Sequence, residues 1–218
     1  MSADRLHGRR AGLPPQTGFS LIELVVVVSI LAVLLALALP SFSEWIRNNQ
    51  VRSAAESLRD GLQLARSEAV KRNARLRFQL VSTLDAGCAI SATGPYWIVN
   101  AGAAVSPAGA CNAAPSPTTV PAVVQASPAT AAAARVTFAV NAAGSANAVT
   151  AFDASGRQVA TSNPTTTPGS PAFYVDVSST GALCLPAGKV RCLRVAVSTA
   201  GQVRMCDPTA VSTDPARC

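Results

Sequence analysis

Six cysteines are the side chains of this 218-residue chain best suited to covalent chemistry. They lie far apart and include no Cys-x-x-Cys pair, at Cys88, Cys111, Cys184, Cys192, Cys206 and Cys218. An even number of cysteines without metal-ligand spacing indicates disulfide bonds and an oxidising compartment. Many pairings are open, and we favour Cys88–Cys111 and Cys192–Cys206 because each pair brackets one loop.

The residue types of the chain also argue against enzymatic chemistry. The single histidine, His7, precedes the long apolar stretch, so the rest of the chain has no histidine for a triad or to activate a cysteine. The sequence has no Gly-Lys-Thr/Ser phosphate loop, and its acidic residues are scattered. A zinc site would have to be all cysteine, at spacings that differ from the usual paired clusters. We therefore expect no enzyme activity, metal or cofactor.

Basic side chains near the C-terminus form a candidate binding site for duplex DNA. Lys189, Arg191, Arg194 and Arg204 fall in the last predicted strands and turns. Such cations neutralise phosphates in a sequence-independent, salt-sensitive way. No aromatic residue interleaves with them, so we expect no stacking platform for single strands. The alternative is that they are solvated charges on an edge hairpin, since a net charge of +7 permits polyanion binding without requiring it.

An acidic residue stands at the entrance of the apolar stretch. Residues Leu24 to Ser43 carry no charge, and as a helix they span about 30 Å, the thickness of a bilayer core. Glu23 directly precedes them, and an unpaired acid at that depth costs roughly 3 kcal/mol. It therefore needs a partner, unless it reaches water at the membrane edge. Basic residues before Gly18 favour a cytoplasmic N-terminus.

The segment Gly18-Phe19-Ser20-Leu21-Ile22-Glu23-Leu24 resembles the class III signal of type IV pilins and type II secretion pseudopilins. The resemblance implies that residues 1–18 are a leader, cut after Gly18 by a prepilin peptidase, and that the new terminus, Phe19, is N-methylated. It also implies that Glu23 pairs with the terminal amine of a neighbouring subunit. Pro40, at the end of the apolar run, kinks the helix, and pilin-like proteins use local melting there in filament packing.

A long helix must position these residues. Leu58, Leu62, Ala65 and Ala69 recur at three- and four-residue steps and predict one apolar stripe. We expect a helix from about Phe19 to Arg72, with Asn73 as its stop. Its first half, residues 19–46, spans the membrane and needs lipid or other subunits, and its second half needs a sheet.

Strands follow the helix. Leu76, Phe78 and Leu80 alternate with polar residues, which predicts a half-buried strand. The other candidates are Tyr96–Val99, Arg135–Val140, Val149–Phe152, Ala172–Val177, Leu183–Leu185, Val190–Val197 and Gln202–Cys206, with one more at Val120–Val124 inside a long loop, 101–134. This order predicts an α+β fold in which the helix packs on an antiparallel sheet, with residues 47–218 as a globular domain outside the cytoplasm.

Three further segments carry more specific resemblances. Arg47–Arg52 and Leu64–Asn73 resemble the GspH/FimT family, and Gly201-Gln202-Val203-Arg204 resembles the Gly-Arg-x-Arg element of FimT-type minor pilins that bind DNA, with Gln202 in place of the first arginine. The resemblance implies a minor pilin that assembles into or primes a type IV pilus, with DNA binding and uptake in natural transformation as a second role. The alternative is a GspH-type minor pseudopilin of a type II secretion system.

The same resemblance implies partners and a location. The partners are other minor and major pilins or pseudopilins, the prepilin peptidase, the inner membrane and, for the second role, duplex DNA. The chain would cross the inner membrane once with its C-terminal domain in the periplasm, and then reach the cell surface in a pilus or pseudopilus.

Overall fold

A computed structural model describes residues 18–129, 133–140, 148–167 and 173–218. The chain divides into two compact units, one that ends at Phe42 and one that comprises Ser43–Cys218, which we call the head. Within the described ranges, no single helix is long and apolar enough to cross a membrane, whereas the bent pair Leu21–Leu37 and Ser41–Arg72 meets that test by length and composition.

The helix α1 comprises Leu21–Arg72. It begins two residues later than predicted because Ser20 is its N-cap. The Ser20 hydroxyl oxygen accepts a hydrogen bond from the Glu23 N–H at 3.2 Å, and its carbonyl accepts one from the Leu24 N–H at 3.2 Å. A serine at this position satisfies donors that the helix itself leaves unpaired.

The C-terminus of α1 confirms the predicted stop. Asn73 adopts a left-handed conformation with φ of 49°. The Ala74 N–H donates to the Ala69 carbonyl at 3.1 Å, and the Asn73 N–H donates to the Val70 carbonyl at 3.2 Å. These two bonds form a Schellman motif, which ends the helix by satisfying its last carbonyls.

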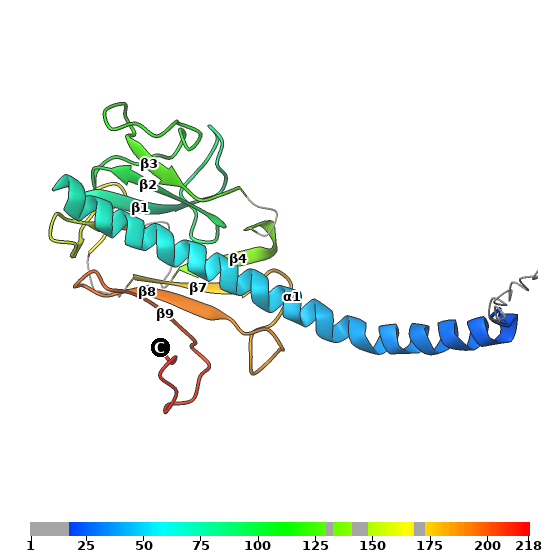
Figure 1. Ribbon diagram of the computed structural model, residues 1–218. Helices are drawn as coiled ribbons and strands as arrows, with labels where there is room; N and C mark the ends of the chain where they lie inside the picture. Colours follow the sequence, from blue (N-terminus) through cyan, green and yellow to red (C-terminus); the bar gives the residue numbers. More distant parts are fainter. Residues whose placement is uncertain (1–17, 130–132, 141–147, 168–172) are drawn as a thin grey trace, which may run out of the picture. The chain divides into compact units, whose positions relative to one another are not determined.

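Two antiparallel sheets complete the head (Figure 1). The five-stranded sheet has the order β3-β2-β1-β5-β6 and the four-stranded sheet the order β4-β7-β8-β9. The strands of the first are β1 (Leu76–Val81), β2 (Tyr96–Ala101), β3 (Val123–Ala126), β5 (Val149–Phe152) and β6 (Gln158–Val159). Those of the second are β4 (Val136–Val140), β7 (Phe173–Ser179), β8 (Leu193–Val197) and β9 (Val203–Cys206), and a short 3-10 helix, η1 (Ala133–Arg135), precedes β4.

The predicted α+β class is confirmed, although several strands differ in detail. The strands form two sheets where we expected one. Leu183–Leu185 is not a strand and only Cys184 makes an isolated bridge, with Val190. The strand expected at Val190 begins at Leu193, because the preceding residues form a disulfide-closed loop.

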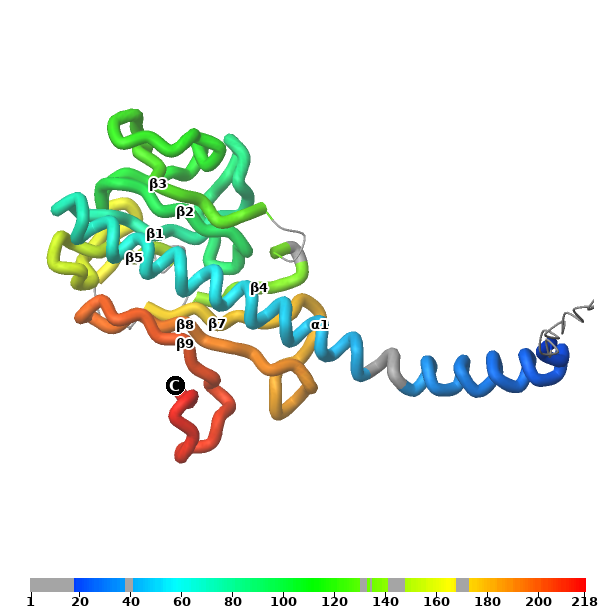
Figure 2. Tube along the Cα trace, viewed as in Figure 1, coloured from blue at the N-terminus to red at the C-terminus, as the bar shows by residue number. Residues whose placement is uncertain are grey.

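The second part of α1 packs across both sheets (Figure 2). Its predicted stripe is confirmed, since Leu58, Leu62, Ala65 and Ala69 have no exposed surface. These side chains share one core with residues from both sheets, among them Phe78, Phe152, Phe138, Val175 and Val195. A single helix therefore joins the two sheets through apolar contact, the main favourable term in folding.

The prediction that β1 is half-buried is wrong, because all six of its residues are buried. The polar side of the strand is covered by loops that Arg77 holds. Its guanidinium donates to Gln79 Oε1 at 2.9 and 2.6 Å, to the Ala103 carbonyl at 3.3 Å, and to the Asn163 carbonyl. Burial lowers the pKa of Arg77 to about 10, so the group stays charged at neutral pH.

Three disulfides close local loops. The predicted pair Cys88–Cys111 is present. The prediction Cys192–Cys206 is wrong, because Cys184 bonds to Cys192 and Cys206 to Cys218. The register places Arg194 opposite Cys206, so Cys192 is a diagonal neighbour at roughly 7–8 Å. That separation exceeds the reach of a disulfide.

Candidate functional site

The first candidate region is the start of α1, where the residues expected to be processed lie. A Cβ built on Gly18 would meet nothing within 4 Å, and Phe19 is 86% exposed. Glu23 lies in the first turn of α1. Pro40 lies inside the helix. The apolar residues between Leu21 and Leu37 are exposed, so this segment offers a continuous surface to lipid or to other helices.

The second candidate region is the turn between β8 and β9, which carries the predicted DNA-binding residues. The Gly201 N–H donates to the Ser198 carbonyl at 2.8 Å, and the Gln202 N–H donates to the Ser198 hydroxyl at 3.1 Å. Gly201 has φ of 78°, and a Cβ at this position would overlap the Gly156 carbonyl. Only glycine fits this turn without displacing the backbone beneath it.

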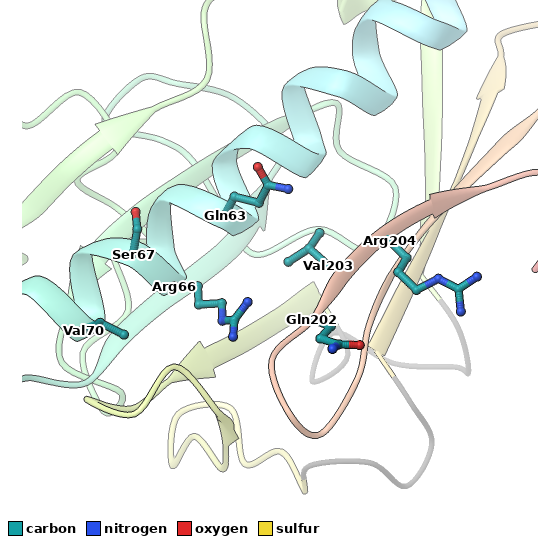
Figure 3. A pocket seen from close by; sticks show the side chains of 7 residues that line it. All are labelled: Gln63, Arg66, Ser67, Val70, Gln202, Val203 and Arg204. Carbon is teal, nitrogen blue, oxygen red and sulfur yellow. The ribbon is translucent and has the colours of Figure 1, made fainter. Parts of the chain in front are cut away.

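Arg66 holds the β5–β6 turn, which lies beneath the β8–β9 turn, against α1. Its Nε donates to the Gly156 carbonyl at 3.1 Å, and next to it the Gln158 N–H donates to the Thr199 carbonyl at 3.1 Å. The helix, the five-stranded sheet and the β8–β9 turn therefore meet at one place. A groove of about 620 Å³ lies there, lined by Gln63, Arg66, Ser67, Val70, Gln202, Val203 and Arg204 (Figure 3).

Of the predicted cations only Arg204 contributes exposed positive charge at this groove, and the other exposed cation there, Arg157, was not predicted. Arg204 is exposed, and Figure 3 shows its side chain pointing away from α1. Arg157, beside Gly156, is also exposed, and Arg66 is half-buried. The nearby carboxylate is Asp153, whose pKa is lowered by hydrogen bonds from the Ser155 hydroxyl and the Arg157 N–H. Asp153 stays ionised and offsets part of the positive field.

Two of the predicted cations lie at the opposite end of β8, in the loop before the strand. Lys189 Nζ lies 2.9 Å from Glu44 Oε1, and the hydrogen bond to Glu44 raises the pKa of Lys189. Arg191 Nε lies 2.8 Å from Asp207 Oδ2. Both charges are therefore matched by carboxylates, away from the turn that carries Gly201, Gln202 and Arg204.

Arg194 is also neutralised, by a neighbour across the sheet. Its guanidinium donates to Asp176 at 2.6 and 2.9 Å, and this bond raises the pKa of Arg194. The same group lies 3.9 Å from the centre of the Tyr174 ring. The fold thus brings an aromatic ring to one of the cations, although no aromatic residue interleaves with them in the sequence, and Arg194 itself covers that ring.

Sequence reasoning missed Arg66, Arg157 and Tyr174 as neighbours of the site. Arg66 and Gly156 are 90 residues apart, and Tyr174 reaches Arg194 only through the β7–β8 pairing. No local pattern signals either contact. Within the described ranges, no group of three or more histidine, cysteine or acidic residues could hold a metal ion.

Comparison with known proteins places these features in a family. The model of the family described as "Type II transport protein GspH" matches residues 54–201, and that of the "Prokaryotic N-terminal methylation motif" matches residues 13–39. Type IV major fimbrial protein FimA of Dichelobacter nodosus is 47% identical over 49 residues, and a fimbrial protein of Moraxella nonliquefaciens is 49% identical over 47 residues. Each match covers 22% of this chain and 30% of the relative, so the chain spans under a third of the curated relatives' length.

Solved structures give a further likeness. Two crystal forms of the type IV minor pilin FimU of Pseudomonas aeruginosa PAO1 align with 75% and 76% of this chain and with 98% and 95% of their own. Their sequences are 16% and 17% identical to it, and the TM-scores are 0.44 and 0.45.

Proposed function

Since the chain belongs to the GspH family of type IV pilin-like proteins, we propose that it is a minor pilin that assembles into or primes a type IV pilus. The observation that carries the proposal is the start of α1: an accessible Gly18-Phe19 segment, an acid in the first helical turn, and then a run of exposed apolar side chains. The fimbrial names of the curated relatives support a pilus. The family's own description supports the alternative, a minor pseudopilin of a type II secretion system.

Each part of this segment has a role in the proposal. A prepilin peptidase cuts after Gly18, and Phe19 becomes the methylated terminus. Residues 19–46 cross the inner membrane once and hold the head in the periplasm until the subunit enters a filament. There Glu23 pairs with the terminal amine of a neighbour, and the charge pairing offsets the desolvation of both groups. The chain acts as a structural subunit and a substrate of processing enzymes, not as an enzyme.

Replacing Glu23 with glutamine tests the assembly role. Loss of the carboxylate leaves the neighbour's amine buried and unpaired, a penalty of about 3–5 kcal/mol. We expect at least a tenfold loss of the chain from filaments sheared off the cell, measured by immunoblot, with an unchanged amount in the membrane. Glu44→Gln is the control, because Glu44 pairs with Lys189 of its own head. Equal incorporation of wild type and Glu23→Gln contradicts the pairing.

Deletion of the gene separates the pilus from the secretion system. A minor pilin predicts fewer or shorter pili with protein secretion intact. Secretion that stops while pili assemble identifies the pseudopilin instead. Either phenotype leaves the Glu23 result interpretable, because both filaments use the same terminal pairing.

We propose contact with duplex DNA as a second role of the β8–β9 turn. Exposed Arg204 and Arg157 support it. The carboxylates that neutralise Arg191 and Arg194, and the glutamine at position 202, leave few cations to bind phosphate. The proposal is therefore a weak, salt-sensitive interaction centred on Arg204.

Replacing Arg204 with alanine should weaken duplex binding about three- to tenfold. It should also lower the slope of log affinity against log salt by about one, the value for one lost phosphate contact. A gel-shift titration at low and moderate salt measures both quantities. Arg75→Ala is the matched control, since Arg75 is exposed and lies between α1 and β1, outside the turn. Equal affinities for the two variants, or no binding by wild type at low salt, remove DNA from the function.

A further inference from the structure

A second basic cavity lies in the part of the head that follows the apolar stretch of α1. It has a volume of about 460 Å³ and is lined by Ser43, Ile46, Arg47, Gln50, Arg135, Ser179 and Thr180. We call it the Arg47–Arg135 notch. Neither arginine was a candidate binding residue in the sequence, because they are far apart in the chain and belong to different elements.

Backbone pairing fixes one wall of the notch. Arg135 ends η1 directly before β4, and the register of β4 with β7 places Val136 opposite Ser179. The Thr180 N–H then donates to the Arg135 carbonyl at 2.9 Å. These bonds hold the backbone of Arg135 beside Ser179 and Thr180, at the edge of the four-stranded sheet.

The other wall is α1, which is tied to the head beside the notch. Asn48, next to Arg47, accepts a hydrogen bond at its Oδ1 from the Arg191 N–H at 2.8 Å. Val51, one turn further along the helix, is fully buried in the core. The two arginines are thus carried by backbone segments that the fold holds in place, a condition for a preorganised binding site.

The two arginines give the notch a positive charge that no carboxylate in it neutralises. Among the described residues, no carboxylate lies within ion-pair distance of Arg47 or Arg135, and no acidic side chain lines the cavity. The nearby acid, Glu44, is paired with Lys189. Two guanidinium groups with hydroxyl and amide side chains around them suit a phosphate, which accepts parallel N–H bonds from arginine.

The position along α1 suggests where the phosphate comes from. Arg47 follows Ser43, the last residue of the uncharged run, by about 6 Å of helix rise, which is the depth of lipid headgroups outside the hydrocarbon core. Trp45 is 60% exposed, and tryptophan is enriched at the membrane–water interface. We propose that the Arg47–Arg135 notch binds the headgroup phosphate of an anionic phospholipid in the periplasmic leaflet. The inference rests on the membrane insertion in the proposed function.

Quenching of Trp45 fluorescence by brominated lipid tests the proposal on the full-length chain in nanodiscs. Two basic side chains at the interface should give roughly tenfold preference for brominated phosphatidylglycerol over brominated phosphatidylcholine. The double variant Arg47→Gln, Arg135→Gln should quench equally with both lipids. Arg204→Gln, which removes an exposed charge outside the notch, should keep the wild-type preference. A preference that survives in the double variant, or is missing in wild type, overturns the proposal.

Three further outcomes are distinguishable. No quenching of wild type by either lipid means that the chain does not insert, and the proposed function fails together with the notch. If soluble glycerol phosphate abolishes the preference for phosphatidylglycerol at a concentration at which inorganic sulfate has no effect, the site binds a free phosphate compound. That result overturns the proposal of a lipid ligand. If the double variant keeps the lipid preference but is no longer incorporated into filaments, the notch contacts a neighbouring subunit and not a lipid.

Discussion

Replacing Arg77 with methionine should lower the free energy of unfolding of the head by about 3 kcal/mol. Methionine keeps an unbranched apolar side chain, but it lacks the guanidinium, so the carbonyls of Ala103 and Asn163 lose a donor. Each unsatisfied buried acceptor costs about 1–3 kcal/mol. Gln79 Oε1 suffers less because the Ser106 hydroxyl still donates to it at 3.1 Å. Urea unfolding of Ser43–Cys218, followed by circular dichroism, measures the change.

Arg75→Met is the matched control for this substitution. Arg75 is exposed and lies two residues before Arg77 in the sequence, so its loss should change stability by less than about 0.5 kcal/mol. A stability gain in Arg77→Met would mean that desolvation of the guanidinium outweighs its hydrogen bonds, as happens when apolar residues replace some buried charges. That result would contradict the role of Arg77 in stabilising the two loops that contain Ala103 and Asn163.

Replacing Gly201 with alanine should destabilise the head by roughly 3 kcal/mol. The left-handed backbone, with φ of 78°, penalises any Cβ by about 1–2 kcal/mol. The added methyl must also displace the Gly156 carbonyl, which Arg66 holds. For a domain of this size, the midpoint of thermal unfolding should fall by about 6–12 °C. Differential scanning calorimetry of the same fragment records it.

Gly181→Ala separates backbone strain from overlap. Gly181 also has positive φ, at 71°, but a Cβ there would meet nothing within 4 Å. Gly181→Ala should therefore lower the free energy of unfolding only by the backbone strain, about 1–2 kcal/mol. Equal losses of stability in the two variants would show that the overlap with Gly156 adds nothing to the cost of a side chain at position 201. The β8–β9 turn would then not be held against α1 through Gly156.

Local signals in the sequence predicted most of the secondary structure. The stripe from Leu58 to Ala69 and the stop at Asn73 depend on residues within a few positions of each other, so the pattern alone specifies them. The same holds for β5, whose bounds at Val149–Phe152 agree with the prediction. Spacing along the chain did not reveal how the strands divide between two sheets, because that division depends on pairings between distant segments.

The candidate site was less predictable for the same reason. A cation is available for binding only if no carboxylate reaches it, and Asp176 reaches Arg194 from the opposite strand. Asp207 likewise reaches Arg191 from beyond β9. The sequence shows which residues are charged, whereas only the tertiary structure shows which charges are matched. Once the ion pairs are known, Arg204 and the Arg47–Arg135 notch remain as the candidate binding sites.

The two candidate binding sites lie far apart on the same helix. Arg47 and Arg66 are separated by about 28 Å of helix rise, with the apolar stripe of α1 between them. Occupation of the notch by lipid therefore leaves the β8–β9 turn accessible to a second ligand. The proposed contacts with the membrane and with DNA thus use separate surfaces, and each can be tested by substitutions that spare the other.

The local character of the disulfides has a mechanical consequence. The bonds span 23, 8 and 12 residues, and none of them joins the two sheets to each other or either sheet to α1. Tension applied between α1 and the rest of the head is therefore resisted by packing and hydrogen bonds alone. Once those yield, the three loops stay closed, so the chain extends to less than its full contour length and retains short cross-linked segments from which the sheets can pair again.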